Sequence, residues 1–353
     1  MTKKVAEIRK KAESAKTGET AKRAQAAKKV EIRKKAKIEK RARAAKKAGT
    51  AKTAETRKRA GPAKKSATRR RAKIKGKARA IVQDTRSVAE RPQTRGFVPD
   101  ASVAIWLTAV ATAGGAVSAD RVRLIDGLVK SLKDCGVWDR LDRLWVFAAE
   151  NQAQALIDLV GRGRATAVNE PSFIADLGYA FDGSTQYIDT GFDAAAASAP
   201  KYSRNSASFG GAIFAGATIT GVEFGNDYSA YSMLITHYST TRRFQINSAT
   251  DSAERIPHNE AFVGHFHGQR SAENLTELFL DGVLQGSSLE PSSQVPGRTF
   301  FIGAGRGGSG PSNFSDASVS TAHVGGSFSP EQVVQFDSAI RSYLSSIAPP
   351  SRP

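Results

Sequence analysis

The feature that most constrains this chain is a change of composition near residue 95. Residues 1–95 contain 35 Lys and Arg against 8 Asp and Glu, a formal charge of +27, and no aromatic residue or histidine. Residues 96–353 contain 18 basic and 25 acidic residues, a charge of −7. A segment this charged and this poor in large apolar side chains cannot bury a core. We therefore predict a polycationic arm over residues 1–95, joined to a mildly acidic globular body.

The composition of the arm favours helix. Ala, Lys, Arg and Glu dominate residues 3–60, and all four are good helix formers. Five of the six Glu in that range have a cation four residues later, the spacing of a favourable pair on a helix surface. The large apolar residues do not sustain a heptad repeat, so no stable coiled coil is expected. We predict an arm that is helical when its charge is screened and extended otherwise.

A polyanion is the ligand that this arm fits best. Contacts with phosphates release counterions, so affinity for nucleic acid should fall steeply with salt. Without aromatic rings to stack on bases, binding should be indifferent to sequence. An acidic protein surface and an inert tether are the alternatives. The candidate polyanion-binding residues, in the densest basic runs, are Arg33, Lys34, Lys35, Arg57, Lys58, Arg59, Arg69, Arg70 and Arg71.

Residues 96–165 are predicted to form a small helical unit. Ser118 is a good N-cap for a helix over residues 119–134, in which apolar residues recur on one face. A second apolar group follows at residues 138–145, and a third short helix is expected near residues 153–160. The most apolar window, residues 101–113, is too short to span a bilayer, which needs about 20 residues. We therefore expect no membrane insertion.

Residues 166–353 are predicted to form a mainly β domain, an antiparallel β-sandwich. Short alternating segments are separated by Gly, Asn, Asp and Ser, the pattern of strands joined by turns. Asp281 and Gly282 can supply the positive φ angles of a tight hairpin. Ser329, Pro330 and Gln332 are typical of a helix N-terminus and predict a closing helix that ends near residue 345.

Several stretches resemble a known family. The runs DGLVKSLKDCGVW (126–138) and LDRLWVFAA (141–149) are similar to a helical module of tailed-phage and prophage structural proteins. Residues 166–173 resemble the connector of that family, and residues 179–191 and 278–283 resemble strands of its laminin-G or concanavalin A-like jelly roll. The resemblance implies a virion- or tail-associated protein whose jelly roll binds a cell-surface glycan or another virion protein.

The sequence offers little support for catalysis or for a cofactor. The Glu-x-Asp-x-x-Glu pattern of jelly-roll glucanases is absent, and Asp182, Asp189 and Asp281 fit turns better than a catalytic pair. His265 and His267 share one face of an expected strand, but a metal site would need further ligands, and none is predicted. Calcium, which some laminin-G-like domains bind through loop Asp residues, is the cofactor left open.

The predicted function is that of a non-enzymatic, virion-associated structural protein that binds a glycan or another virion protein. The arm would attach it to nucleic acid or to an acidic surface. The alternative is a non-specific DNA-packaging or nucleoid-associated protein of the bacterial cytoplasm, and the third candidate is a glycan depolymerase. At the rim of the sandwich the candidate ligand-binding residues are Asn226, Asp227, Tyr228 and Tyr231.

Overall fold

The computed structural model describes residues 97–353, apart from residues 227–228, 240, 250–253, 258–261 and 348–353. All the candidate polyanion-binding residues, from Arg33 to Arg71, lie outside the described residues. The predictions made for the arm therefore stay predictions.

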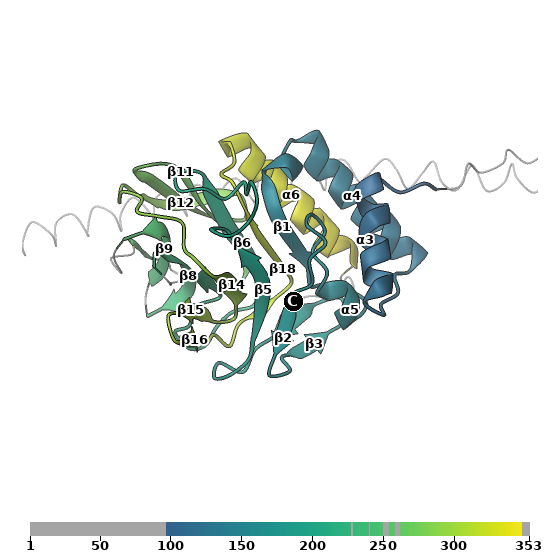
Figure 1. Cartoon of the computed structure of the whole chain (residues 1–353), viewed down its shortest axis with the longest axis horizontal. Coiled ribbons are helices and arrows are strands. Elements are labelled where there is room, and N and C mark those ends of the chain that lie inside the picture. The colour runs from purple at the N-terminus through teal and green to yellow at the C-terminus, as the bar shows by residue number, and fades with distance from the viewer. Residues whose placement is uncertain (1–96, 227–228, 240, 250–253, 258–261, 348–353) are drawn as a thin grey trace, which may run out of the picture. The chain divides into compact units, whose positions relative to one another are not determined.

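The body consists of two antiparallel sheets with a layer of helices on one side (Figure 1). The larger sheet has the order β13-β12-β11-β6-β17-β4-β3, with β18 pairing both β6 and β1. The smaller sheet has the order β10-β9-β8-β7-β14-β5-β2. The predicted fold class, a mainly β antiparallel sandwich, is confirmed.

The elements have the following bounds. The larger sheet comprises β1 (Leu141–Val146), β3 (Ser172–Ile174), β4 (Gly178–Ala180), β6 (Ala207–Ala215), β11 (Gly264–Ala272), β12 (Leu275–Leu280), β13 (Val283–Ser288), β17 (Ser318–Val319) and β18 (Thr321–Gly325). The smaller sheet comprises β2 (Thr166–Val168), β5 (Tyr187–Asp193), β7 (Phe224–Asn226), β8 (Tyr231–Tyr238), β9 (Thr241–Ser248), β10 (Glu254–Pro257) and β14 (Thr299–Ile302). The other elements are α3 (Ala101–Thr112), α4 (Ala119–Asp134), η1 (Trp138–Arg140), α5 (Gln152–Ala155), the hairpin of β15 (Gly305–Gly307) and β16 (Gly310–Ser312), and α6 (Pro330–Ile347).

Local capping signals set the helix ends. The hydroxyl of Ser118 accepts a hydrogen bond from the amide of Arg121 at 3.2 Å, which confirms the predicted start of α4. At α6, the Ser329 hydroxyl accepts from the Gln332 amide while the Gln332 side chain accepts from the Ser329 amide, a reciprocal capping box. None of the described helices is long and apolar enough to cross a lipid bilayer.

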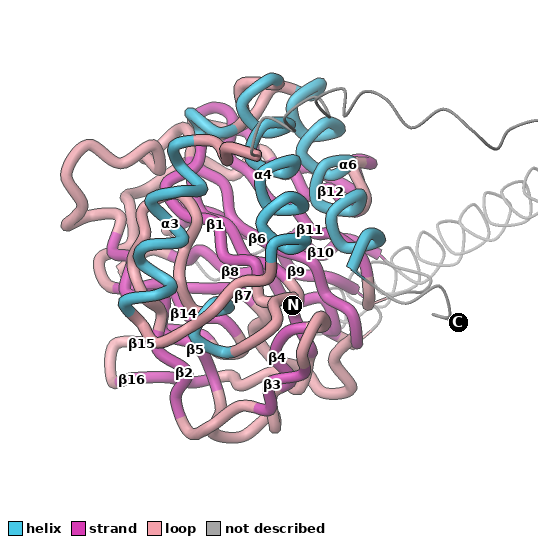
Figure 2. Tube along the Cα trace, turned by 90° about the vertical axis from the view of Figure 1, so that its right-hand side faces the viewer, coloured by secondary structure: helices cyan, strands magenta, loops and turns pink. Residues whose placement is uncertain are grey.

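Two apolar cores lie on opposite faces of the larger sheet. The core between the sheets includes Trp145, Phe209, Phe244, Phe266 and Phe300. The core between the larger sheet and the helices includes Trp106, Ile125, Leu132, Phe279 and Phe336. Figure 2 shows α3, α4 and α6 on the same side of the molecule, over the strands that they cover.

The prediction that residues 96–165 form a helical unit is wrong at residues 141–146. These residues form β1, which pairs with β18 in the larger sheet, with Leu144 opposite His323. Leu144 packs into the helical core and Trp145 into the core between the sheets. Residues 144–149 are a continuous buried apolar run, which periodicity cannot distinguish from a buried helix.

Candidate functional site

A cleft of about 700 Å³ lies where an edge strand of each sheet comes close to α5. We call it the seam cleft. Its floor includes Leu156 and Ala165, which belong to the core between the sheets. The lining residues are Gln152, Leu156, Arg164, Ala165, Thr166, Ala167, Glu170, Pro171, Ser172 and Phe173.

The chain crosses from one sheet to the other at the rim of the seam cleft. Asn169 and Glu170, which join β2 to β3, have φ angles of 57° and 54°, in the left-handed region that few non-glycine residues adopt. Two side chains hold this turn: Asn169 Nδ2 donates to the Thr185 carbonyl at 2.8 Å, and Gln186 Nε2 donates to the Glu170 carbonyl at 3.3 Å. Such strain, of order 1–3 kcal/mol per residue, is common at ligand-binding sites. The turn sets the Glu170 carboxylate at the exposed rim.

The neighbouring loop is fixed by the carboxylate of Asp182. This side chain accepts hydrogen bonds from the amides of Ser184, Thr185 and Gln186. Although burial acts in the opposite direction, these donors hold the pKa of Asp182 below its ordinary value. The predicted turn role of Asp182 is confirmed, and its oxygens already accept from protein groups.

Three polar side chains at the seam cleft have no partner within the described part of the chain. Gln152, Arg164 and Glu170 are all exposed, and no hydrogen bond or ion pair engages their side chains there. Beside them lies the half-buried ring of Phe173, which packs against Tyr179 with ring centroids 5.3 Å apart. An amide, a guanidinium, a carboxylate and an aromatic ring thus line one cleft.

The ring of Tyr179 packs against the ring of Phe173. The Tyr179 ring is fully buried and meets Phe147 edge to face at 5.7 Å. Burial raises the pKa of Tyr179 to about 12, although the positive charge of Arg164 acts in the opposite direction. Phe173 is therefore held on a rigid, uncharged stack.

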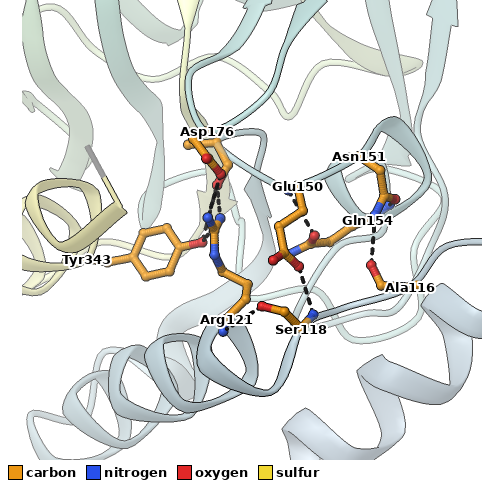
Figure 3. Close-up of polar contacts among 9 residues, drawn as sticks. Ala116, Ser118, Arg121, Glu150, Asn151, Gln154, Asp176 and Tyr343 are labelled. Atoms are coloured by element: carbon orange, nitrogen blue, oxygen red, sulfur yellow. Dashed lines mark hydrogen bonds and ion pairs between the residues drawn. The ribbon is translucent and has the colours of Figure 1, made fainter. Parts of the chain in front are cut away.

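A polar network ties the first turn of α4 to both sides of the seam cleft (Figure 3). Figure 3 shows the Arg121 guanidinium pointing between Asp176, which follows β3, and Tyr343 of α6. Arg121 donates to Asp176 at 2.5 Å, to the Tyr343 hydroxyl at 3.1 Å and to the Ala148 carbonyl at 2.9 Å. These bonds fix the position of the segment that carries Phe173.

The same network fixes the segment that carries Gln152. The Glu150 carboxylate accepts from the Ser118 amide at 2.9 Å, and Asn151 Nδ2 donates to the Ala116 carbonyl at 2.7 Å (Figure 3). The Asn151 carbonyl oxygen of the side chain also accepts from the Gln154 amide and caps α5. The seam cleft is therefore built on anchored segments, although its residues come from distant parts of the sequence.

Glu223 and Asp281 lie outside the seam cleft, and their carboxylates serve structural roles. Glu223 is fully buried and accepts from the Thr236 amide at 2.7 Å and the Ser315 hydroxyl at 3.2 Å. Burial raises the pKa of Glu223 to about 7, a value typical of a catalytic acid, but this residue lines none of the described clefts. Asp281 and Gly282 have φ angles of 51° and 73°, which confirms the predicted hairpin turn.

The fold brings three histidines together under α6. His267 Nδ1 lies 3.0 Å from His323 Nε2, and His265 Nδ1 lies 3.2 Å from Asp337. Both His267 and His323 pair with Gly210 of the strand between them, so no intervening side chain separates the two rings. Within the described ranges, no group of three or more His, Cys, Asp or Glu is arranged to hold a metal ion. We interpret these histidines as part of the packed helical core.

The rim cluster predicted from the sequence does not form as a unit within the described residues. Asn226 is fully buried, and its Nδ2 donates to the Arg298 carbonyl at 2.6 Å, so this side chain does not reach a rim. Asp227 and Tyr228 lie outside the described residues. Tyr231 is half-buried and packs with the small apolar cluster of Val222, Met233 and Ile235. For Tyr231 the binding role stays a prediction.

Gln152, Arg164, Glu170 and Phe173 are not among the site residues predicted from the sequence. Residues 166–173 were interpreted only as a connector, because the pairing of β2 and β3 with different sheets is not visible in the sequence. The available signal was Asn169-Glu170-Pro171, a polar run before a proline that is typical of a turn.

No protein-family model matches this sequence, and no curated protein matches it. Among solved structures, the chain is similar to domain 4 of AbnA, a GH43 extracellular arabinanase from Geobacillus stearothermophilus, in complex with arabinotriose, at 15% identity and a TM-score of 0.36 over 56% of this chain and 98% of that one. It is also similar to Trypanosoma rangeli sialidase in complex with sialic acid, at 13% identity and a TM-score of 0.40 over 62% of this chain and 39% of that one.

A third similar structure is the botulinum neurotoxin serotype D binding domain, at 11% identity and a TM-score of 0.41 over 57% of this chain and 52% of that one. The chain thus spans less than two thirds of the sialidase and neurotoxin chains. At these TM-scores the similarities carry no argument. The topology itself defines the class: a two-sheet antiparallel β-sandwich whose larger sheet is covered by helices.

Proposed function

We propose that the body is a carbohydrate-binding module whose ligand occupies the seam cleft. The observation that carries this proposal is the set of unpartnered side chains of Gln152, Arg164 and Glu170, which line one cleft together with the ring of Phe173. A sugar ring presents apolar C–H faces, which pack on aromatic rings, and hydroxyls, which pair with amide, guanidinium and carboxylate groups. A few such polar groups beside an apolar floor are what a small-molecule site requires.

We further propose that this module binds its ligand without cleaving it. Most glycoside hydrolases need two carboxyl groups about 5–10 Å apart across the scissile bond. Among the residues that line the seam cleft, Glu170 is the one carboxylate. Glu223, whose pKa burial raises to about 7, lines none of the described clefts, which supports binding rather than hydrolysis.

The binding experiment uses the full chain on neutral glycan arrays at high salt, where contacts of the arm with anions are screened. Phe173→Ala and Gln152→Ala should each weaken binding of the best neutral glycan about tenfold, the cost of one good contact. Phe97→Ala is the matched aromatic control, since Phe97 is 46% exposed and lies before α3, outside the seam cleft. Equal affinities for all three variants, or no bound glycan, would contradict the proposal.

A parallel assay for released sugars tests the second proposal. No release is expected from any glycan that the full chain binds. Release that disappears in Glu170→Gln would make the protein a hydrolase and would overturn the non-catalytic assignment.

The wider role that we propose is attachment of this module to a virion or another anionic assembly through residues 1–95. The sequence resemblance to tailed-phage and prophage structural proteins supports the virion, and the charge of +27 supports an anionic partner. Mass-spectrometric detection of the chain in purified particles tests this role. Recovery with cellular DNA and not with particles would favour the nucleoid-associated alternative.

A further inference from the structure

A second groove runs along α3 and shares Arg164 with the seam cleft. It has a volume of about 640 Å³, and we call it the α3 groove. Figure 1 shows α3 next to α5, with β2 and β3 close by. The lining residues are Ile105, Thr108, Ala109, Thr112, Ala113, Ile157, Arg162 and Arg164.

The sequence of α3 explains the apolar floor of this groove. The helix has no charged residue, and Val103, Trp106 and Val110 already fill the core beneath it. The opposite side still carries apolar groups, including Ile105, which is 49% exposed. Surface helices usually expose a polar face to solvent, so the apolar residues on the exposed side of α3 are unusual.

The backbone beside α3 is held firmly. Trp106 Nε1 donates to the Ile157 carbonyl at 3.2 Å, and Ile157 forms an antiparallel bridge with Arg164. Leu156 contributes to the seam cleft and the adjacent Ile157 to the α3 groove. The two cavities therefore flank one short segment, and Arg164 borders both.

Two unpaired guanidinium groups lie where the seam cleft and the α3 groove adjoin. Arg162 and Arg164 are exposed, and no ion pair engages either side chain in the described part of the molecule. Arg162 has a φ angle of 62°, and its amide donates to the Asp158 carbonyl at 3.1 Å. The nearby Asp158 carboxylate is fully buried and already accepts from the amides of Leu144 and Gly161.

The charges around the α3 groove favour an anionic ligand. No carboxylate is among the residues that line it, and both cations lie beside apolar lining residues. A guanidinium pairs with a carboxylate or sulfate through two parallel hydrogen bonds, which are stronger than neutral ones. The hydroxyls of Thr108 and Thr112 donate to carbonyls within α3 and can accept from a ligand.

We propose that the natural ligand is an extended acidic oligosaccharide that spans both cavities. One part of the oligosaccharide lies in the seam cleft, and the oligosaccharide continues past Arg164 into the α3 groove. There its acidic groups pair with Arg162 and Arg164, and its C–H faces pack on Ile105 and Ile157. This inference rests on the proposed function, because it extends the ligand of the seam cleft.

The test is hydrogen exchange followed by mass spectrometry on the full chain, which localises protection and so separates both cavities from the arm. The probes are oligogalacturonates, oligomannuronates and sulfated galactans of two, four and eight units, with neutral galactose oligomers of equal length. Neutral oligomers should protect peptides over residues 164–173 alone. Acidic tetramers or octamers should also protect residues 104–113.

Two variants test whether Arg162 pairs with the acidic groups of the ligand. Arg162→Ala should weaken binding of the best acidic octamer about tenfold, through the loss of one charge-assisted pair, and should remove protection at residues 104–113 only. Its effect on the neutral oligomer should be less than twofold. Arg123→Ala, which removes an exposed arginine of α4 outside both cavities, should change neither.

The outcomes separate the two proposals. Protection of residues 164–173 by neutral and acidic oligomers alike, with residues 104–113 unchanged, would overturn the extended acidic ligand and leave the proposed function standing. No protection of either region by any probe would count against both.

Discussion

His267 Nδ1 lies 3.0 Å from His323 Nε2, and the two rings stack with centroids 5.1 Å apart and planes inclined by 11°. One nitrogen of this pair must donate and the other accept, so the accepting ring is neutral. Phe336 of α6 packs edge to face on His323, which places the pair directly under that helix. Burial lowers the pKa of His267 to about 3 and that of His323 well below its ordinary value.

We predict that acid destabilises the body through these two histidines. Their folded pKa values are below the unfolded value of about 6.5, so the unfolded state binds more protons below that pH. The stabilisation is complete above pH 6.5 and is lost progressively as the pH falls toward 3. The free energy of unfolding should fall by about 1.4 kcal/mol per pH unit for each histidine. Urea titrations of the wild type and of His323→Phe at several pH values would measure this slope. An unchanged slope in the variant would contradict the prediction.

Glu223 should act in the opposite direction. Its folded pKa of about 7 exceeds the ordinary value of 4.5, so the folded state binds more protons between these values. The stabilisation is complete below pH 4.5 and is lost as the pH rises through 7. Glu223→Gln keeps an acceptor for the Thr236 amide and removes the charge, and should raise the free energy of unfolding at pH 8 by about 3 kcal/mol. At pH 4 the same substitution should have little effect, which serves as its internal control.

Gly210 should tolerate no side chain. It has a φ angle of 150°, and a Cβ atom there would come 2.3 Å from the Phe266 carbonyl oxygen. Gly210→Ala should therefore lower the thermal midpoint of unfolding by more than Gly127→Ala, where a Cβ meets nothing within 4 Å. Calorimetry of both variants checks this, and equal midpoints would contradict it.

A fragment that begins at residue 166 should not fold on its own. It lacks β1, the neighbour of β18, and it lacks α4, which packs with Phe336 and Ile340 of α6 in the helical core. A fragment of residues 95–353 retains both and should unfold cooperatively. Near-ultraviolet circular dichroism and thermal unfolding of the two fragments would test this. A cooperative transition in the shorter fragment would show that β1 and α4 are dispensable.

The arm should bind duplex DNA without regard to sequence. If about six phosphates are engaged, affinity should fall by orders of magnitude between low and physiological salt. Replacing Arg69, Arg70 and Arg71 by Gln should make the slope of log affinity against log salt concentration shallower by about three. Fluorescence anisotropy with random duplexes measures both effects. A full chain that ignores DNA at low salt would favour an acidic protein surface as the partner.

Local signals in the sequence predicted the local structure. Ser118 and Ser329 began helices where expected, and Asp281 with Gly282 made the expected turn, because each signal acts within four residues. Helix α3 was not predicted, since its residues are apolar on every side and show no periodicity. The available signal was Asp100, whose carboxylate caps the helix through the Ser102 amide.

The seam cleft could not be predicted from such signals. Gln152, Arg164 and Phe173 line one cleft because β2 and β3 join different sheets, and that pairing depends on partners in β5 and β4. The stacking of His267 on His323 likewise depends on Gly210 in a third strand. Long-range pairing decides these sites, whereas propensity and capping act only on neighbouring residues.

The placement of β1 next to β18 also governs when the body can form during synthesis. Strand β1 ends at Val146, and its partner begins at Thr321, so the ribosome translates almost the whole sandwich before the two can pair. Until then Leu144 and Trp145 lack the strand that orders them. Folding should therefore be a late event with slow, non-local pairing, and the nascent chain is exposed to aggregation in the interval. The polycationic segment precedes the body in the sequence and emerges before it, so its charge repels other nascent copies while the body is still incomplete.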